Sequence, residues 1–406
     1  MQANLRRALV AVALIASAPS AFADVITDWN EKAVAFVTPR MTPPAAQRVV
    51  AIVQIAMFDA VNSIEGRYRP YLAQVPSAAT ASKEAAAAAA AGSVLAGLHP
   101  QAQAELKAAM TGYLSNIPDS EAKSEGIKLG EAVAAKILEA RARDGADAPD
   151  SYRPKAKPGV YVPTPITVAS MWPNVKPFAM TSPSQFRPEP PIALHSEQWA
   201  SDYNEIKDLG ATTSSKRSAK QTEDARFWLI TGPQSTDPVA RQLAAVKGMN
   251  VIDNARFMAL TAVALADAYI AVMDAKYHYE FWRPITAIRN GDITGNPDTT
   301  PVPTWEPIDV TPMHPEYPCA HCIVSMAVAT VIEATLGSAD IPEVAITAPS
   351  APGVTHRFTN LKAYTDEVAN ARIYAGFHYR NSTVVGQGMG KEIGAYTVKT
   401  ILEPLN

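Results

Sequence analysis

The feature that most constrains this sequence is a pair of cations at the end of a long apolar segment. Residues 251–276 are mostly apolar and end on Lys276, and Arg283 follows seven residues later. If the helix continues through 276–283, two turns separate the cations, which then point from one face about 10 Å apart. Two buried cations on one face cost too much to serve packing alone. The sequence therefore predicts an anion between them, a protein carboxylate or a bound oxyanion, with Pro284 ending the helix.

The first residues have the features of a secretion signal. Arg6 and Arg7 precede the apolar run 8–16, which is too short to span a bilayer. The run Ala-Phe-Ala at 21–23 gives the small-x-small pattern of a cleavage site. We therefore predict a signal peptide over residues 1–23 and an exported protein, periplasmic or secreted. No later segment is apolar enough to predict a membrane span.

Charge and cysteine content narrow the class of protein further. Removal of residues 1–23 takes away two arginines and no acid, so the net charge moves from −3 to −5. A mildly acidic chain argues against nucleic acid as a partner. The only cysteines are Cys319 and Cys322, which excludes a disulfide framework. Export makes their oxidation plausible, but the sequence leaves open whether they pair.

The hydrophobic periodicity predicts an all-α protein in two halves, an N-terminal half over 24–195 and a C-terminal half over 196–406. Residues 49–61 are apolar nearly all round, which indicates a buried helix, and the alanine run 85–91 predicts a close-packing one. Two stretches, 290–317 and 338–360, are predicted to be loops. Helices are predicted over 101–114, 119–143, 196–209, 217–230, 237–250, 321–336, 361–377 and 382–401.

A proline-rich stretch over 146–193 interrupts this pattern. Its eleven prolines exclude a sustained helix, and strand alternation is poor. A structureless stretch of this length is unusual inside a compact domain. Its aromatic residues, Trp172 and Phe178 among them, indicate that it wraps the surface in an ordered form.

Three cations and two imidazoles form the predicted site. Lys276, Arg283 and Arg372 supply positive charge, and the arginine fork matches a tetrahedral oxyanion. Each charge-assisted hydrogen bond to such an anion contributes about 1.5–3 kcal/mol. Of His321 and His378, one can attack or coordinate the central atom while the other gives or takes a proton.

This predicted site places a condition on the helix that carries Arg372. On a straight helix, Arg372 and His378 would lie about 120° apart. Both can face one anion only if the helix ends or distorts near Gly376.

These residues occur in three motifs: Lys276-x6-Arg283-Pro284, Pro318-x-x-His321 and Arg372-x5-His378. The motifs resemble those of the vanadium-dependent haloperoxidase and type 2 phosphatidic-acid phosphatase superfamily. The context, residues 281–289 and His314 to Pro318, is closer to the bacterial haloperoxidase branch. The resemblance spans most of the mature chain and implies a helical bundle pair of the vanadium haloperoxidase and acid phosphatase type.

The resemblance also assigns roles at the site. His378 would be the axial ligand of vanadate, or the nucleophile if the anion is a phosphoryl group. Lys276, Arg283 and Arg372 would hold the equatorial oxygens, with Lys276 polarising peroxide. His321 would be the acid–base residue. Vanadium would act as a Lewis acid without changing redox state, so neither haem nor flavin is required.

The second motif departs from the family pattern Pro-Ser-Gly-His, because Cys319 and Ala320 occupy the Ser and Gly positions of the cofactor-binding turn. A thiol donates hydrogen bonds poorly, and a cysteine in a disulfide donates none. The backbone N–H of Ala320 can still serve if its dihedrals suit a residue with a side chain. In the third motif, Ala371 replaces a usual Ser, and Ser382 stands where an Asp often follows the histidine. These departures bear on vanadate affinity and not on the fold.

Two residues are candidates for a halide pocket. His314 stands where bromoperoxidases tend to have His and chloroperoxidases Phe, which favours bromide or iodide. Trp282 precedes Arg283 and could line the pocket, although a tryptophan in this context more often belongs to the core. The remaining histidines are predicted to be structural or on the surface: His99, His195, His278 and His356.

The predicted function is oxidation of halide by hydrogen peroxide with vanadate as cofactor. The alternative on the same residues is a phosphomonoesterase that takes a phosphate ester, with phosphate in the site and a phosphohistidine at His378. A non-catalytic oxyanion-binding protein and a thiol–disulfide protein using Cys319 belong to other classes. A homo-oligomer is possible, and the sequence does not decide the oligomeric state.

Overall fold

A computed structural model describes residues 24–163 and 166–405, so the predicted signal peptide over 1–23 lies outside the described residues. The all-α prediction is confirmed, with one small hairpin added. In chain order the elements are α1 Val25–Val37, α2 Pro43–Glu65, α3 Lys83–Leu98, α4 Gln103–Leu114, α5 Glu121–Arg141, α6 Glu197–Leu209, α7 Ala219–Phe227, α8 Pro233–Val246, α9 Val251–Tyr279, α10 Pro284–Arg289, α11 Ala320–Leu336, β1 Asp340–Thr347, β2 Thr355–Asn360, α12 Leu361–Tyr374 and α13 Arg380–Thr400. Short 3-10 turns lie at Pro100–Ala102, Trp172–Asn174 and Gly291–Thr294.

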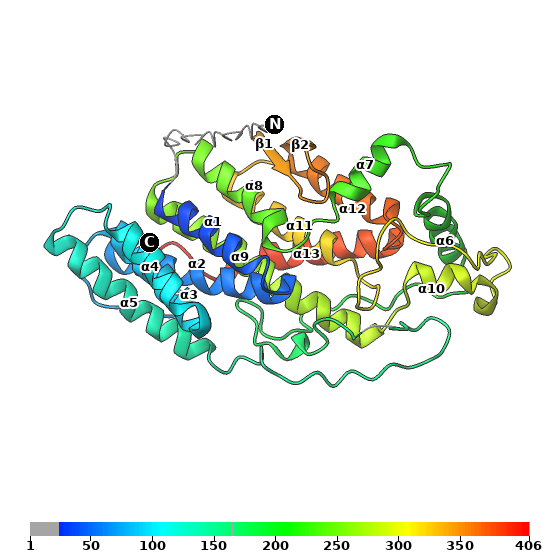
Figure 1. Cartoon of the computed structure of the whole chain (residues 1–406), viewed down its shortest axis with the longest axis horizontal. Coiled ribbons are helices and arrows are strands. Elements are labelled where there is room, and N and C mark those ends of the chain that lie inside the picture. The colour runs from blue at the N-terminus through cyan, green and yellow to red at the C-terminus, as the bar shows by residue number, and fades with distance from the viewer. Residues whose placement is uncertain (1–23, 164–165, 406) are drawn as a thin grey trace, which may run out of the picture.

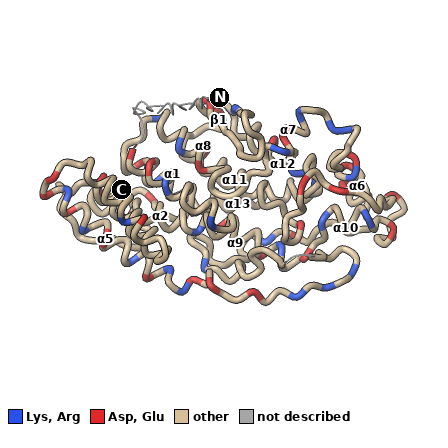
Figure 2. The backbone as a smooth tube through the Cα atoms, viewed as in Figure 1, with Lys and Arg blue, Asp and Glu red and all other residues tan. Residues whose placement is uncertain are grey.

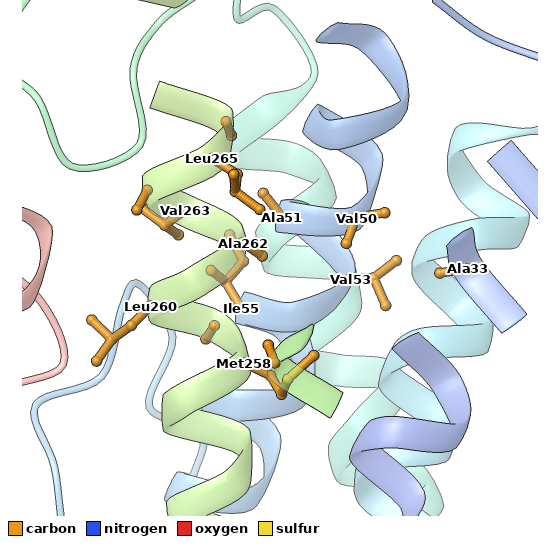
Figure 3. Packing of buried hydrophobic residues seen from close by; sticks show 14 of the residues in the cluster. Ala33, Val50, Ala51, Val53, Ile55, Met258, Leu260, Ala262, Val263 and Leu265 are labelled. Carbon is orange, nitrogen blue, oxygen red and sulfur yellow. The ribbon is translucent and has the colours of Figure 1, made fainter. Parts of the chain in front are cut away.

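The two longest helices, α2 and α9, form the centre of the core. They pack against each other, and α11 packs against both α9 and α13. Figure 3 shows aliphatic side chains of α2, Ile55 among them, directed at those of α9, such as Ala262. Contrary to the prediction that no segment after the signal is apolar enough, both helices are long and apolar enough to cross a membrane, but 89% and 100% of their most apolar stretches are buried inside the protein. They are core helices, which explains why an all-round apolar pattern occurs here.

The outer helices lie on both sides of this centre. Figure 1 shows α3, α4 and α5 at one end of the molecule and α6 and α10 at the other. The alanine run of α3 is buried throughout and packs against α5. A Cβ at Gly130 of α5 would come within 2.3 Å of the Ala86 carbonyl oxygen, so the backbones are in direct contact. The predicted close-packing helix is confirmed.

The end of α9 differs from the prediction that one helix runs through 276–283. The helix ends at Tyr279 because Glu280 adopts a left-handed conformation, with φ 51°, and its N–H bonds the Lys276 carbonyl. Arg283 then caps α10, and Pro284 is the first residue of that helix. The prediction that Pro284 ends a helix is therefore wrong: proline fits a first turn, where its missing N–H costs nothing. Lys276 and Arg283 converge through a turn and not along one helix face.

Residues 338–360 were predicted to be a loop and instead contain a hairpin. Strand β1 pairs antiparallel with β2, with Val344 opposite Phe358 and Ile346 opposite His356. The inward side chains of β1 alternate with exposed ones and join the core. This alternation is short and is followed by a proline and glycine turn, so packing on the helices decides the strand conformation.

The proline-rich stretch is an ordered wrap across α9, as predicted, apart from 164–165, which the structure does not describe. The buried carboxylate of Asp267 accepts the backbone N–H groups of 178–180 at 2.7–2.8 Å. Further along, Arg187 pairs with Asp274 of α9 through two hydrogen bonds of 2.8 Å. Burial raises the pKa of Asp267 to about 6, against the three N–H donors that lower it.

The helix break required near Gly376 is present. Helix α12 ends at Tyr374, and Gly376 takes a left-handed φ of 80°. A Cβ at Gly376 would lie 2.5 Å from the Gly210 carbonyl oxygen, so glycine is also required by space. His378 follows in the turn between α12 and α13, and the prediction is confirmed.

Positive and negative residues are mixed along the outer elements. Figure 2 shows Lys or Arg and Asp or Glu interspersed along the outer helices and loops.

Candidate oxyanion site

The five predicted site residues come from five different places and converge. Lys276 is in the last turn of α9, Arg283 caps α10, His321 is in the first turn of α11, Arg372 is in the last turn of α12, and His378 follows that helix. The side chains of all but His321 are at most 2% exposed. Burial lowers the pKa of His378 well below its usual value, and the charges of Arg283, Lys276 and Arg372 lower it further. Three buried cations thus act on one imidazole.

Arg283 joins two of the histidines. Its Nη1 lies 3.3 Å from His378 Nε2, and its Nη2 lies 3.0 Å from His314 Nδ1. The same guanidinium donates from Nε to the His314 carbonyl oxygen at 2.9 Å and from Nη1 to the Phe377 carbonyl oxygen at 3.0 Å. Burial lowers the pKa of Arg283 to about 10, so the guanidinium stays charged at neutral pH. His314 therefore lies beside Arg283, and its role in a halide pocket stays a prediction.

Glu316 holds the other side of the His378 ring. Its Oε1 accepts from His378 Nδ1 at 2.9 Å and from the Tyr379 N–H at 3.1 Å. Because a carboxylate accepts at Nδ1, the hydrogen-bond pattern assigns the proton to Nδ1 and leaves a lone pair on Nε2. Nε2 is the atom that faces Arg283, so His378 is arranged as a ligand or nucleophile.

Glu316 is the protein carboxylate that could lie between the cations. Within the described part of the chain, it makes an ion pair with His378 and with no lysine or arginine. Burial raises its pKa to about 7, while Lys276 and Arg283 act in the opposite direction. The carboxylate therefore supports His378 from behind and does not bridge the cations.

Lys276 was predicted to hold an oxygen of the anion, but its ammonium is already held by backbone carbonyl groups. Its ammonium donates to the carbonyl oxygens of Pro315, Glu316 and Pro318 at 2.9, 2.7 and 2.6 Å. These bonds occupy its three N–H donors. Burial lowers its pKa well below the usual value, and Arg283 lowers it further. Lys276 therefore shapes the 315–318 turn and adds charge, and direct contact with an anion requires the exchange of one carbonyl bond.

Arg372 has an N–H donor without a hydrogen-bond partner among the described residues. Its Nη1 donates to the Trp228 carbonyl oxygen at 2.6 Å, while Nε is buried with no hydrogen-bond partner among the described residues. Burial, followed by the charge of Arg283, lowers its pKa to about 9. A buried unpaired guanidinium N–H is costly, so this donor calls for an acceptor such as an oxyanion.

His321 is also set up as a neutral imidazole. Its Nε2 lies 3.0 Å from the Ile230 carbonyl oxygen, which can only accept, so Nε2 carries the proton and Nδ1 the lone pair. Burial lowers the pKa of His321 well below its usual value, with Arg372 the largest of the charges that add to this effect. The ring can therefore accept a proton at Nδ1.

The second motif forms the start of α11. Cys319 is its N-cap and forms a disulfide with Cys322, so its side chain has no S–H to donate. Ala320 is the first helical residue and has no left-handed backbone, so its methyl group is accommodated without strain. Its N–H lies at the positive end of the helix dipole, where an anion is favoured.

Trp282 packs against aromatic side chains. It is 1% exposed and stacks on Trp199, with ring centroids 6.0 Å apart, in a cluster of aromatic side chains. This position favours a packing role over a halide-pocket role. The Trp282 backbone N–H donates to the Gly159 carbonyl oxygen, which ties the proline-rich stretch to the first motif.

A cavity of about 680 Å³ reaches Arg283 from the surface. Its other lining residues include Tyr161 from the proline-rich stretch and Met313 from the loop before α11. The cavity gives small molecules a route towards the buried group.

Glu316 is the site residue that the sequence reasoning missed. It lies 62 positions from His378, and nothing in its sequence neighbourhood marks a partner. The one available signal was Ser382, which stands where an Asp often follows the histidine. Without that Asp, His378 needs a carboxylate partner from elsewhere in the chain.

Together the fold and the buried cluster of cations and imidazoles define a helical-bundle protein with a candidate oxyanion site. The family model for the vanadium chloroperoxidase N-terminal domain matches residues 22–175, and that for the second helical-bundle domain matches residues 256–406. The chain belongs to the vanadium haloperoxidase family.

Individual relatives agree with this assignment. The chain is 30% identical over 143 residues to the vanadium chloroperoxidase of Curvularia inaequalis, a match that covers 29% of this chain and 23% of that enzyme. A crystal structure described as the first bacterial vanadium-dependent iodoperoxidase superposes with a TM-score of 0.79 at 23% identity, over 94% of this chain and 97% of that one. The apo form of a bacterial vanadium-dependent chloroperoxidase gives a TM-score of 0.70 at 18% identity, over 88% and 93%. These structures share the fold.

Proposed function

We propose that this protein is a vanadate-dependent haloperoxidase that uses hydrogen peroxide to oxidise bromide or iodide. The observation that carries the proposal is the state of His378: its Nδ1–H is held by Glu316, and its Nε2 lone pair faces a buried group of cations. A neutral imidazole with a fixed tautomer is what coordination of a metal centre requires.

The side chains present fit vanadate. Arg372 Nε is a buried donor that no described protein atom uses, and the Ala320 N–H lies at a helix N-terminus. Arg283 and Arg372 would hold the oxygens, His378 Nε2 would bind the metal, and Lys276 would add positive charge. When bound, vanadate supplies a Lewis acid that activates peroxide towards a halide.

The protein's own residues supply the proton chemistry. His321 is neutral, is held by the Ile230 carbonyl and has its Nδ1 free to take a proton from peroxide. The burial that keeps both imidazoles neutral also strengthens each electrostatic contact in the site. His314, which contacts Arg283, stands at the position where the family resemblance favours bromide or iodide over chloride.

Export remains part of the proposal. A disulfide between Cys319 and Cys322 fits an oxidising compartment such as the periplasm or the exterior of the cell. The predicted signal peptide over 1–23 supports the same location, and cleavage before Asp24 can be read by N-terminal sequencing of the protein recovered from a bacterial periplasm.

The test is a vanadate titration of the purified mature protein with two assays in parallel. Peroxide-dependent oxidation of bromide and iodide should appear only when vanadate is added, and inorganic phosphate should compete it away. Hydrolysis of a phosphate monoester without vanadate, in the absence of halide oxidation, would replace the proposal with the phosphatase alternative. Vanadate binding with neither activity would leave an oxyanion-binding protein.

A further inference from the structure

A second group of ionisable side chains lies outside the oxyanion site, where α7, β2 and α12 meet. It consists of Glu223 and Asp224 on α7 and His356 on β2, with Glu367 of α12 behind the histidine. One side-chain atom from each of Glu223, Asp224 and His356 lies within 4.8 Å of the others. None of these residues takes part in the proposed peroxidase chemistry.

His356 is the unusual member of this group. Its side chain is only 4% exposed, and the Phe227 ring stacks on it at a centroid distance of 3.8 Å. Nδ1 contacts Glu367 Oε1, while Nε2 is buried with no hydrogen-bond partner among the described residues. Nε2 is directed at the acids, 3.6 Å from Glu223 Oε1 and 3.9 Å from Asp224 Oδ1.

We propose that His356 Nε2, Glu223 and Asp224 bind a first-row divalent cation of the zinc type, with Glu367 as the residue that positions the histidine. A carboxylate on one ring nitrogen and a metal on the other is a recurrent arrangement for metal-bound histidine. One imidazole and two carboxylates suit zinc, whereas calcium and magnesium prefer oxygen alone.

The distances are compatible with such a cation. Ligand atoms about 2.1 Å from a tetrahedral zinc ion lie about 3.4 Å from one another. The observed separations of 3.6 and 3.9 Å from His356 Nε2 need shifts of a few tenths of an ångström, and the two carboxylate oxygens lie within 4.8 Å of each other. The Glu223 side chain, which is 44% exposed, is free to make that shift.

Lys220 is the counter-ion that a metal must displace. Its Nζ lies 2.5 Å from Asp224 Oδ1 and 3.3 Å from Glu223 Oε1, and its side chain is 60% exposed. The lysine is exposed while the Asp224 side chain is only 10% exposed, so the pair is partly buried, and a divalent cation, which carries twice the charge, can replace the lysine. Removal of the Lys220 charge should therefore tighten metal binding.

The cluster is connected to the oxyanion site through one residue. Trp228 donates from Nε1 to Glu367 Oε1 at 2.9 Å, and its carbonyl oxygen accepts from Arg372 Nη1 at 2.6 Å. A cation bound at His356 would hold the same carboxylate that fixes the Trp228 side chain.

The experiment is calorimetric titration of the chelator-treated, untagged mature protein with zinc chloride. We expect one equivalent bound at micromolar affinity, weakened at least tenfold in Glu223→Gln and in His356→Gln and tightened severalfold in Lys220→Met. The control Lys216→Met removes a lysine paired with Asp208 at similar exposure and should leave the affinity unchanged. The control His278→Gln removes an exposed histidine and should do the same.

Two results would overturn the proposal. One is the absence of stoichiometric zinc binding in both the wild type and Lys220→Met, which would make the cluster an ion-pair network. The other is binding that Glu223→Gln leaves intact, which would place the ion elsewhere. Because Glu223 is half-exposed, its variant keeps the test decisive even if loss of the buried His356 prevents folding.

Discussion

The replacement Glu316→Gln tests the arrangement of His378 most directly. Glutamine keeps a carbonyl oxygen that can accept from His378 Nδ1 and the Tyr379 N–H, so the shape of the site is preserved. At a pH above about 7, where Glu316 is ionised, the negative charge behind the imidazole is lost. The variant therefore separates the charge of the carboxylate from its geometry.

Two effects of opposite sign follow from this change. A hydrogen bond to a charged acceptor contributes about 1.5–3 kcal/mol and one to a neutral acceptor about 0.5–1.5 kcal/mol, so the ring loses about 1–1.5 kcal/mol of support. That corresponds to roughly tenfold weaker coordination by His378, at the low end of the roughly 10- to 100-fold cost of losing such partners. Removal of a negative charge near Lys276 and Arg283 also makes the pocket more attractive to any anion.

Inorganic phosphate separates the effect on His378 from the effect on the charge of the pocket, because it is attracted by that charge but is not coordinated by His378. We expect Glu316→Gln to weaken vanadate binding about tenfold and to leave phosphate binding unchanged or tighter. Glu316→Ala, which also removes the acceptor, should weaken vanadate binding further. Dissociation constants come from ultrafiltration with vanadate and from competition by phosphate, with halide oxidation measured alongside.

The matched control is Glu205→Gln, which neutralises a part-buried carboxylate that pairs with Arg380 and not with a site residue. If Glu316→Gln changes vanadate and phosphate affinity in parallel, the carboxylate acts on the pocket as a whole and does not tune His378. A vanadate affinity of Glu316→Gln equal to that of the wild type would refute the role of Glu316 altogether.

Three further predictions address the rest of the site and the fold. His378→Ala should abolish turnover while circular dichroism shows an intact helical fold, and an unchanged rate would remove His378 from the mechanism. Cys319→Ser should tighten vanadate binding roughly tenfold to a hundredfold, because it adds a hydroxyl donor worth about 1.5–3 kcal/mol to a charged acceptor. The control Cys322→Ser opens the same disulfide without adding that donor and should change vanadate affinity little. Weaker vanadate binding in Cys319→Ser would contradict this explanation. Burial raises the pKa of Asp267 to about 6, so its contribution to stability is fully present below pH about 3.8 and is lost as the pH rises through 6. Relative to Asp267→Asn, the wild type should lose on the order of 3 kcal/mol between pH 4 and pH 7, read from melting temperatures, and a difference that is constant with pH would rule out this titration.

Much of this protein could be predicted from local patterns. The all-round apolar segments 49–61 and 251–276 predicted the buried α2 and α9, because a helix that is apolar on every side must be enclosed. The angular separation of Arg372 and His378 predicted the break near Gly376, since a straight helix cannot direct both at one point. These inferences depend on residues close together in the chain, where spacing alone determines direction.

Other features were decided only by tertiary contacts. Glu280 bonds the backbone of Tyr161, β1 bonds Gln242 of α8, and Lys276 is held by carbonyl groups of 315–318, so all three features involve neighbours distant in the sequence. The support of His378 by Glu316 is the clearest case, because no propensity or period relates residues 62 positions apart. The motifs determined which groups could meet an anion, and packing decided which nitrogen of each imidazole kept its lone pair, since a tautomer is set by a hydrogen-bond partner that only the folded chain brings into reach.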